Sequence, residues 1–302
     1  MEPSTQILKE QIAVVTGGGR GIGRAVAQTL GQAGAAVAAL ARSAQELNET
    51  VTLIHQEGGR AQAFVADVTD AAAVSRAFQE IERSMGAIDV LVNNAAVLKP
   101  FGPLWENDVD EWWRGMEVNV RGPMLCAQAV LPQMIARRRG RIINISSGAG
   151  AMGAPYYSSY IVSKTALIRM TECLALETAA HGLAIFAISP GTVRTAMSEY
   201  SLQSPEGQRW LPWYRRVFEE HIDVPAERPA RLVLELASGK ADAMSGRFLS
   251  VFDDLELLLR HSADIEEQDL YTLRLPRLAG APGNAALASV LAEARRTADP
   301  HK

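Results

Sequence analysis

TGGGRGIGRAV, residues 16–26, follows directly on the short apolar run IAVVT and leads into a helical pattern over 21–33. Gly17, Gly21 and Gly23 let the backbone turn tightly between the predicted strand and the predicted helix. Beyond them, the helix N-terminus offers free N–H groups and the positive end of the helix dipole. The stretch therefore predicts a strand, a glycine turn that can approach a pyrophosphate, and a helix. Its Gly-x3-Gly-x-Gly spacing differs from the commoner Gly-x-Gly-x-x-Gly.

The alternation of strand and helix continues along the chain. Short runs without polar alternation predict six further strands, at 36–40, 61–66, 88–92, 141–146, 183–189 and 247–252. Longer apolar or amphipathic patterns predict helices at 44–57, 70–85, 110–138, 158–180 and 226–238. Strands that are apolar on both sides are covered on both faces. The sequence therefore predicts an α/β fold, a doubly wound Rossmann-type parallel sheet in a three-layer α/β/α sandwich.

One region inside the chain departs from this alternation. Residues 196–225 carry Trp210, Trp213 and Tyr214 with no clear period. Inserted aromatic loops of this kind often form lids over a binding site. These three side chains either line a substrate pocket or pack an additional helix.

The C-terminal region departs from it as well. Residues 253–302 join an acidic helical stretch to a tail rich in proline, glycine and alanine. Leu255, Leu258 and Leu259 form one apolar stripe on the helical stretch. We expect one Rossmann-type domain over 1–252, with 196–225 as its lid, and a docked helical extension with a tail over 253–302.

The composition excludes several classes of protein. With a net charge of −4 and one dense basic run at 137–141, the chain is not expected to bind nucleic acid. Cys126 and Cys173 lie in apolar helical patterns, where we expect reduced packing residues, and the five histidines show no ligand spacing, so no metal is expected. Neither a signal peptide nor an apolar run of membrane-spanning length is present, which predicts a cytoplasmic protein without a membrane partner.

The end of the second predicted strand bears on the choice of dinucleotide. An acidic residue there would bind the free ribose diol of the adenosine. The chain instead reads ALARS, with Ala41 and Arg42, and a second guanidinium, Arg20, lies inside the glycine turn. Two guanidiniums without a carboxylate suit a 2′-phosphate, unless Arg42 is an ordinary solvated residue at a helix start. We therefore expect NADP(H) as the preferred cofactor, with NAD(H) as the alternative.

The segment YYSSYIVSK at 156–164 carries the candidate chemistry. Tyr160 and Lys164 are four residues apart on a predicted helix and share one face. The nearby ammonium and the positive ring of an oxidised nicotinamide would stabilise the Tyr160 phenolate and lower its pKa from ~10. A tyrosine tuned in this way exchanges a proton with a carbonyl or alcohol oxygen.

The remaining residues of this segment are expected to have supporting roles. Ser158 and Ser159 are the expected cap of the helix, because hydroxyl side chains accept hydrogen bonds from the first free N–H groups. Tyr156 and Tyr157 precede this cap and are neither of them one helical turn from Lys164. We expect them to form the wall of a pocket.

Taken together, these motifs resemble the short-chain dehydrogenase/reductase family, in its single-domain branch. The resemblance covers about residues 10–252 and rests on TGGGRGIG, the DV after the third strand, NNAA, the asparagine of MEVNV, INISS, YIVSK and SPGTVRT. It implies that Tyr160 is the catalytic acid/base and that Lys164 lowers its pKa and binds the nicotinamide ribose. It implies further that Ser147 holds the substrate oxygen, and that Asn119 anchors a water linking the lysine to solvent.

The motifs and the resemblance also imply contacts with the cofactor. The glycine turn would hold the phosphates, the strand ends would contact adenine and ribose, and the stretch 190–195 would meet the nicotinamide carboxamide. The residues expected to bind the cofactor, besides Tyr160 and Lys164, are Gly17, Gly19, Arg20, Gly21, Ile22, Gly23, Arg42, Asp67, Val68, Asn94, Ala95, Ala96, Pro190, Gly191, Val193 and Thr195.

The expected function is an NADP(H)-dependent oxidoreductase that interconverts a small-molecule carbonyl and a secondary alcohol by hydride transfer. The alternative is a non-catalytic NAD(P)-binding sensor or regulator on the same fold. The apolar helices over 110–138 and 158–180, together with the resemblance, predict a homodimer or homotetramer. Two departures from the family are Ala96, where glycine is commoner, and VFDDLEL followed by a long extension, where a strand ending in Asp-Gly-Gly is usual.

Overall fold

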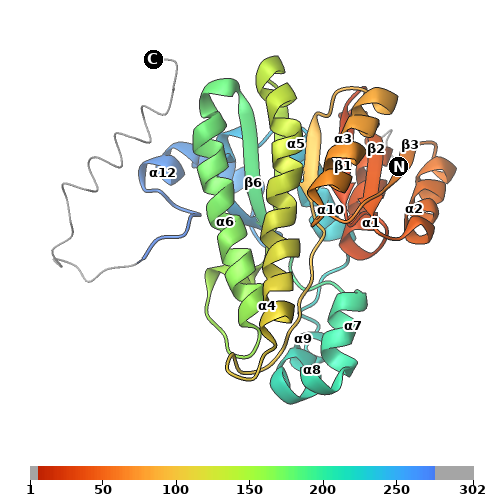
Figure 1. Cartoon of the computed structure of the whole chain (residues 1–302). Helices are drawn as coiled ribbons and strands as arrows, with labels where there is room; N and C mark the ends of the chain where they lie inside the picture. Colours follow the sequence, from red (N-terminus) through yellow and green to blue (C-terminus); the bar gives the residue numbers. More distant parts are fainter. Residues whose placement is uncertain (1–5, 276–302) are drawn as a thin grey trace.

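Seven apolar runs form the strands of one sheet in the computed structural model, which describes residues 6–275 (Figure 1). The strands are β1 (Ile12–Thr16), β2 (Ala36–Ala41), β3 (Arg60–Val65), β4 (Val90–Asn93), β5 (Gly140–Ile145), β6 (Leu183–Ser189) and β7 (Phe248–Ser250). Every neighbouring pair is parallel, in the order β3-β2-β1-β4-β5-β6-β7. The predicted doubly wound sheet is therefore confirmed. Its order reverses between β1 and β4, where open α/β sheets bind ligands.

Helices cover both faces of this sheet. One face packs against α1 (Gly21–Gln32), α2 (Ala44–Gln56) and α10 (Glu227–Ala237). The other packs against α3 (Ala71–Met85), α5 (Gly122–Arg137) and α6 (Ser158–Thr178). Successive side chains of a strand point to opposite faces, so Val14 belongs to one core cluster and Val15 to the other. The three layers follow from this double burial.

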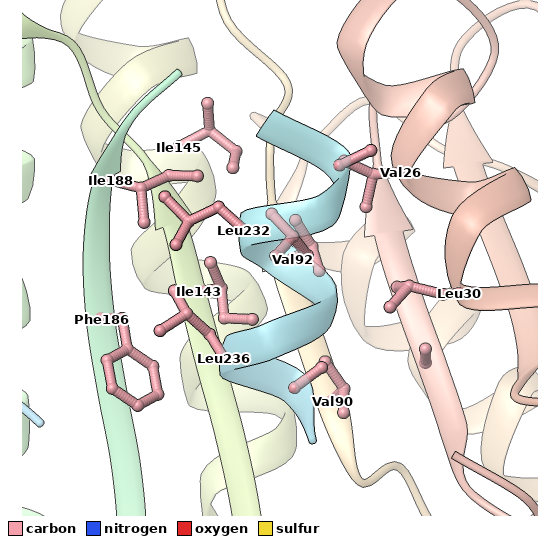
Figure 2. Packing of buried hydrophobic residues seen from close by; sticks show 14 of the residues in the cluster. Val26, Leu30, Val90, Val92, Ile143, Ile145, Phe186, Ile188, Leu232 and Leu236 are labelled. Atoms are coloured by element: carbon pink, nitrogen blue, oxygen red, sulfur yellow. The ribbon is translucent and has the colours of Figure 1, made fainter. Parts of the chain in front are cut away.

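Helix α10 shows how the sheet is covered. In Figure 2, Leu232 and Leu236 of α10 lie over Ile143 and Ile188 of the sheet, with Val26 of α1 beside them. All five side chains are buried. Each such aliphatic side chain contributes about 1.5–3 kcal/mol when it is fully removed from water.

The predicted helix over 110–138 is not a single α-helix. It consists of α4 (Val109–Met116), a π-helical turn over Glu117–Arg121, and α5. The N–H of Gly122 donates to the carbonyl of Glu117, five residues earlier instead of four. Pro123 has no N–H to donate to the carbonyl of Asn119, four residues before it, so the regular α-helical ladder cannot continue here. A prediction from periodicity alone missed this interruption.

Residues 196–225, which show no period in the sequence, fold into three short helices. These are α7 (Ala196–Gln203), α8 (Pro205–Trp210) and α9 (Tyr214–Glu219). Thr195 caps α7 and Ser204 caps α8 through their side-chain oxygens. Figure 1 shows these helices grouped together at one end of the sheet.

The start of the expected C-terminal extension packs onto the domain as two short helices. They are α11 (Leu255–Arg260) and α12 (Ser262–Glu267). Leu258 and Ile265 are buried in the same core cluster as α10. Further on, Arg274 forms an ion pair with Glu172 of α6, with Nη2 2.6 Å from Oε1. The expected tail over 276–302 lies outside the described residues.

Some expectations from composition can be compared with the described residues. Cys126 is buried in α5, but Cys173 is exposed on α6, so the packing role predicted for Cys173 is wrong. Among residues 6–275, no helix combines the length and the apolar character needed to cross a bilayer. The same range contains no group of three histidine, cysteine or acidic side chains placed to hold a metal ion.

Candidate active site

The carboxyl ends of β1 and β4 are tied together at the point where the strand order reverses. The hydroxyl of Thr16 accepts hydrogen bonds from the main-chain N–H groups of Asn94, at 3.0 Å, and Ala95, at 3.1 Å. The side-chain amide of Asn94 donates back to the carbonyl of Thr16 at 2.9 Å. Asn94 thus fixes the position of the glycine turn. Thr16 was not predicted as a site residue, although it stands directly before the three glycines.

The glycine turn forms a cradle that side chains would fill. Gly17 has φ +64°, in the region that favours glycine. A Cβ on Gly17 would lie 2.8 Å from the Asn94 amide nitrogen, and one on Gly23 would lie 2.1 Å from the carbonyl oxygen of Gly17. The turn therefore presents main-chain atoms at the start of α1. This arrangement fits the pyrophosphate of a dinucleotide.

The Gly23→Ala substitution is expected to abolish measurable dinucleotide binding and to lower the free energy of unfolding by about 1–3 kcal/mol. The added methyl group has no space beside the Gly17 carbonyl, so the turn must move away from its anion-binding position. Fluorescence titration with NADPH and urea denaturation measure the two effects. Gly153→Ala is the matched control, because a Cβ there has no neighbour within 4 Å and should change neither property. Wild-type binding by Gly23→Ala would contradict the assigned cradle.

The stretch expected to meet the nicotinamide lies beside this cradle. A Cβ on Gly21 would lie 3.2 Å from the Thr195 methyl group, so the two segments are neighbours. Pro190 and Val193 are buried, and Gly191 has φ +69°. Val193 packs in the hydrophobic core, so its side chain is structural and only its main chain remains for a cofactor contact.

Other expected cofactor residues lie around the same edge. Gly19 is buried against Glu46 of α2, and Ile22 packs against the core of α10. Ala95 and Ala96 continue the chain from β4 and are half-buried. Val68 is buried, with its side chain next to Gly122. The structure thus brings these residues to one edge of the sheet.

The two guanidiniums expected to bind a 2′-phosphate lie at the surface near the end of β2. Arg20 contacts Glu46 through Nη1 and Oε1 at 3.2 Å. Arg42 is 68% exposed, and its Nη1 lies 4.0 Å from Oδ2 of Asp67. Exposed pairs of this kind are worth about 0–1 kcal/mol. A doubly charged phosphate can therefore replace the carboxylates as their partner.

Asp67 has a second, unpredicted partner in Arg114 of α4. Arg114 donates to Asp67 at 3.1 Å and to the hydroxyl of Thr69 at 3.0 Å. Burial tends to raise the pKa of Asp67, but hydrogen bonds from Thr69 and Arg114 outweigh it and hold the pKa below its ordinary value. Asp67 is therefore an anion that can accept hydrogen bonds. The distance of Arg114 along the chain left no local signal for this contact.

Tyr160, Ser147 and Lys164 lie together beyond the end of β5. The side chains of Ser147 and Tyr160 are hydrogen-bonded. Lys164 is buried on the next turn of α6, its Nζ lies 5.5 Å from the centroid of the Tyr160 ring, and it donates to the carbonyl of Ile145 at 2.8 Å. The adjacent Ser146 donates to the main-chain carbonyl of Lys164 at 2.9 Å. Ser146 thus has a structural role, whereas Ser147 contacts the tyrosine.

The protonation of this group differs from the sequence expectation. Burial raises the pKa of Tyr160 from 10.0 to about 12, and the hydrogen bond with Ser147 lowers it only in part. Burial lowers the pKa of Lys164 from 10.5 to about 7. In the protein alone, desolvation therefore outweighs the charge that was expected to lower the pKa of the phenol.

Asn119 lies in the π-helical turn and is fully buried. Its side-chain oxygen accepts from the N–H of Val97 at 2.9 Å, and its amide donates to the carbonyl of Val97 at 2.8 Å. The same amide donates to the hydroxyl of Ser163 at 2.9 Å. The side chain is thus engaged in joining the chain after β4 to α6. The main-chain carbonyl, to which Pro123 cannot donate, is the atom suited to holding a water.

The serines expected to cap α6 do not do so. Helix α6 begins at Ser158 with Tyr157 in the capping position and no side-chain cap. The hydroxyl of Ser158 accepts from the Trp112 indole at 3.0 Å, and Ser159 donates to the main-chain carbonyl of Trp112 at 2.7 Å. Both serines therefore attach α6 to α4. This tertiary contact is what the capping prediction lacked.

Aromatic rings surround Tyr160. Tyr157 is buried and stacks on Tyr160 with ring centroids 6.3 Å apart and an interplanar angle of 20°. Tyr214 of α9 reaches the same place. Burial raises the pKa of Tyr214, the neighbouring Tyr160 raises it further, and a hydrogen bond with Thr192 lowers it. The lid predicted over 196–225 thus lies close to the candidate catalytic tyrosine, and its Trp213 contacts Tyr157, which stacks on Tyr160.

Known proteins resemble this chain over most of its length. A short chain dehydrogenase of Pseudocercospora fijiensis is 33% identical over 261 residues, which are 84% of each chain. The structure of a gluconate 5-dehydrogenase from Burkholderia cenocepacia in complex with NADP and tartrate has a TM-score of 0.72 and 31% identity, covering 83% of this chain and 96% of that one. An NAD+-bound xylitol dehydrogenase structure has a TM-score of 0.74 and 28% identity, with 80% and 98% covered.

The family model for short chain dehydrogenases matches residues 11–206. This range runs from the start of β1 to the start of α8 and includes the glycine turn, Asn119, Ser147, Tyr160 and Lys164. The sheet order, the cradle and the sequence relatives agree with the match. The chain belongs to the short-chain dehydrogenase/reductase family of oxidoreductases.

Proposed function

We propose that the protein is an NADP(H)-dependent oxidoreductase that interconverts a carbonyl compound and a secondary alcohol. The observation that carries this proposal is the grouping of Tyr160 and Ser147, both half-buried, with the buried Lys164 at the carboxyl edge of the sheet. The glycine cradle lies at the same edge and fits a dinucleotide. A hydroxyl, a phenol and an ammonium in this arrangement suit proton exchange with a substrate oxygen.

The residues that would hold the cofactor follow from their places in the site. The glycine turn and the start of α1 would bind the pyrophosphate, and Asp67 with Val68 would border the adenine. Arg20 and Arg42 would bind the 2′-phosphate. Lys164 would bind the nicotinamide ribose, and the main chain of 190–195 would position the carboxamide. When bound, the nicotinamide supplies or accepts the hydride.

The protein would handle the proton and the orientation of the substrate. In the reductive direction, Ser147 donates a hydrogen bond that orients the substrate carbonyl oxygen. Tyr160 then gives its phenolic proton to that oxygen as the carbonyl becomes an alcohol. Lys164, in its charged form, stabilises the resulting phenolate. In the oxidative direction, Tyr160 takes the proton from the alcohol.

A path for returning the proton starts at Lys164 and passes the π-helical turn. Lys164 is buried, so its ammonium needs a relay to exchange protons with solvent. The main-chain carbonyl of Asn119 would hold the first water of this relay. The Asn119 side chain keeps that carbonyl in place through its bonds to Val97 and Ser163. Oxidation of NADPH in the presence of a panel of ketones and aldehydes tests the proposed activity as a whole.

The Arg42→Gln substitution is expected to raise the Kd for NADPH about tenfold and to leave the Kd for NADH nearly unchanged. The reason is that a guanidinium contact with the 2′-phosphate has no counterpart in NADH. Fluorescence titration with each cofactor measures both constants. Arg76→Gln removes another exposed guanidinium, on α3, and should change neither. Equal or tighter binding of NADH by the unmodified protein would contradict the role given to Arg20 and Arg42.

We also propose that the protein is a homodimer or homotetramer. Met124 of α5 and Val162 of α6 are exposed apolar side chains on the helices for which pairing is expected. Exposed apolar surface of this kind is suited to pairing across a two-fold axis. Light scattering after size-exclusion chromatography should give two or four times the chain mass of 32.6 kDa, and a monomer mass would refute this proposal.

A further inference from the structure

Five of the six tyrosines of the chain lie at residues 156–214, close to the candidate site. Three aromatic residues on the side of α6 face three from the lid. This aromatic cluster consists of Tyr156, Tyr157, Tyr160, Trp210, Trp213 and Tyr214. Trp213 and Tyr156 of this cluster are exposed, so packing of the fold does not account for all of its rings.

The rings of the cluster form contacts across the lid. Tyr156 lies against Trp210 with ring centroids 4.9 Å apart, and Tyr157 lies 6.3 Å from Trp213. Tyr157 also stacks on Tyr160, so a row of rings leads from Trp213 to the candidate catalytic phenol. Aromatic pairs prefer such tilted or offset arrangements at about 4.5–7 Å. The lid is thus held against α6 by ring contacts.

The outer rings of this row face solvent. Trp213 is 44% exposed, and Tyr156 is exposed as well. Residues that serve only to pack a helix would be buried, as large aromatic side chains usually are. The partly exposed rings of Trp213 and Tyr156 and the buried ring of Tyr157 instead form a continuous aromatic surface that runs from solvent to Tyr160.

The backbone at Tyr156 is held in an unfavourable conformation. Tyr156 has φ +74°, which costs a bulky residue roughly 1–3 kcal/mol. Its carbonyl accepts a hydrogen bond from the N–H of Gly102 at 2.7 Å. Strained backbone of this kind is found at ligand clamps, where the surrounding structure fixes a side chain in one place. The conformation turns the Tyr156 ring toward Trp210 of the lid.

The charged groups next to the cluster include Arg209, whose guanidinium carbon lies 4.4 Å from the centroid of the Trp210 ring, as well as Lys99 and Glu206. Lys99 lies with its Nζ 4.5 Å from the centroid of the Tyr200 ring. A hydrogen bond with Tyr200 raises the pKa of Lys99, and the nearby Glu206 adds to this effect. Glu206 in turn accepts a hydrogen bond from the Tyr200 hydroxyl. Since Lys99 and Glu206 are engaged with each other through Tyr200, neither favours a charged substrate.

We propose, on the basis of the proposed function, that the substrate is a neutral carbonyl compound with a planar aromatic ring. Its ring replaces the contact between Tyr157 and Trp213, and its carbonyl reaches Tyr160 and Ser147. A ring placed between two ring faces needs them about 7–8 Å apart, because carbon atoms in contact are about 3.5–4.0 Å apart. The present centroid separation is 6.3 Å and the two ring planes are tilted by 46°, so the lid must move outward and the Trp213 ring must turn toward Tyr157 to admit the substrate ring.

A matched pair of bicyclic ketones tests this proposal. β-Tetralone has an aromatic ring next to the ring that carries the carbonyl, and β-decalone is its fully saturated analogue. We expect the unmodified protein with NADPH to reduce β-tetralone with a kcat/KM at least about tenfold higher than its kcat/KM for β-decalone. Trp213→Leu should bring this ratio close to one. Trp105→Leu is the matched control, since Trp105 is 83% exposed, makes no ring contact with the aromatic cluster and should leave the ratio unchanged.

A binding measurement without turnover completes the test. Quenching of protein fluorescence by β-naphthol should saturate with the same Kd in the unmodified protein and in Trp105→Leu. The Kd should be about tenfold higher in Trp213→Leu. Equal kcat/KM values for the two ketones would overturn the aromatic substrate class while the oxidoreductase activity stands. The aromatic substrate class would also be overturned if the protein reduced aliphatic carbonyl compounds but no aromatic ones. Failure to reduce any carbonyl compound, with NADPH bound, would instead refute the proposed function.

Discussion

Tyr160→Phe is expected to lower kcat for carbonyl reduction about a thousandfold. The substitution removes the phenolic O–H that gives its proton to the substrate oxygen. The phenylalanine ring keeps the stacking contact with Tyr157, so the fold and the binding of NADPH should be unchanged. Single-turnover oxidation of NADPH, followed at saturating cofactor and ketone, measures the chemical step directly.

A matched control separates this effect from a general loss of tyrosine. Tyr271 lies outside the aromatic cluster and is exposed. Tyr271→Phe should therefore reduce at the rate of the unmodified protein. If Tyr160→Phe kept full turnover, another group would have to supply the proton, and the assigned mechanism would be wrong.

Lys164→Met is expected to lower kcat/KM at least about a hundredfold, because it removes the charge that stabilises the phenolate. In the unmodified protein, this charge is present only below the pKa of Lys164, which burial lowers to about 7. Tyr160 stays protonated in the free enzyme well above that pH, since burial raises its pKa to about 12. The kcat/KM for reduction should therefore be constant below about pH 7 and fall about tenfold per pH unit above it. A profile that is flat to about pH 9 would contradict this role.

The same substitution should stabilise the protein in mildly acidic solution. The folded-state pKa of Lys164 is depressed from 10.5 to about 7, so the unfolded chain binds this proton more tightly than the folded one. The resulting penalty is fully present below about pH 7 and fades as the pH rises toward 10.5. At about pH 6, Lys164→Met should raise the free energy of unfolding on the order of 2 kcal/mol, after the lost hydrogen bond to Ile145 is subtracted.

Urea denaturation at two pH values measures this change. The gain from Lys164→Met should be largest near pH 6 and lost near pH 9.5, because the penalty falls by about 1.4 kcal/mol per pH unit between the folded-state pKa of about 7 and the unfolded-state value of 10.5. Lys240→Met, on the surface between α10 and β7, should show no such pH dependence. A gain that does not vary with pH would mean that packing, and not the buried charge, sets the stability difference.

Most strands were predictable because apolar runs without polar alternation indicate burial on both faces. β1 and β6 are buried at every position and begin and end at the predicted residues. The π-helical turn was not visible as a period, but Pro123 marks the point where the α-helical ladder must break. The three short helices α7, α8 and α9 were not predicted either, because the packing of this region on Tyr157 depends on contacts between distant segments.

The sequence predicted which residues form the candidate site better than it predicted their pKa values. The family resemblance implied Ser147 as the residue that holds the substrate oxygen. Ser147 contacts the Tyr160 phenol in the structure, whereas Ser146 donates to the main-chain carbonyl of Lys164. In the protein alone the pKa of Tyr160 is raised and not lowered, because the one-turn spacing to Lys164 shows the charge but not the desolvation of both groups. The approach of Tyr214 to Tyr160 could not be seen from two positions so far apart in the sequence.

The central claim is that hydride passes between the nicotinamide and a carbonyl carbon while Tyr160 supplies the proton. The most direct test uses NADPH deuterated at the transferring position of the nicotinamide, with β-tetralone and the full-length protein. Mass spectrometry of the product should show one deuterium on the carbinol carbon for the unmodified protein, and almost no labelled alcohol for Tyr160→Phe. Tight NADPH binding without labelled alcohol from this ketone or any other carbonyl compound would contradict the claim, and would favour a sensor built on the same fold.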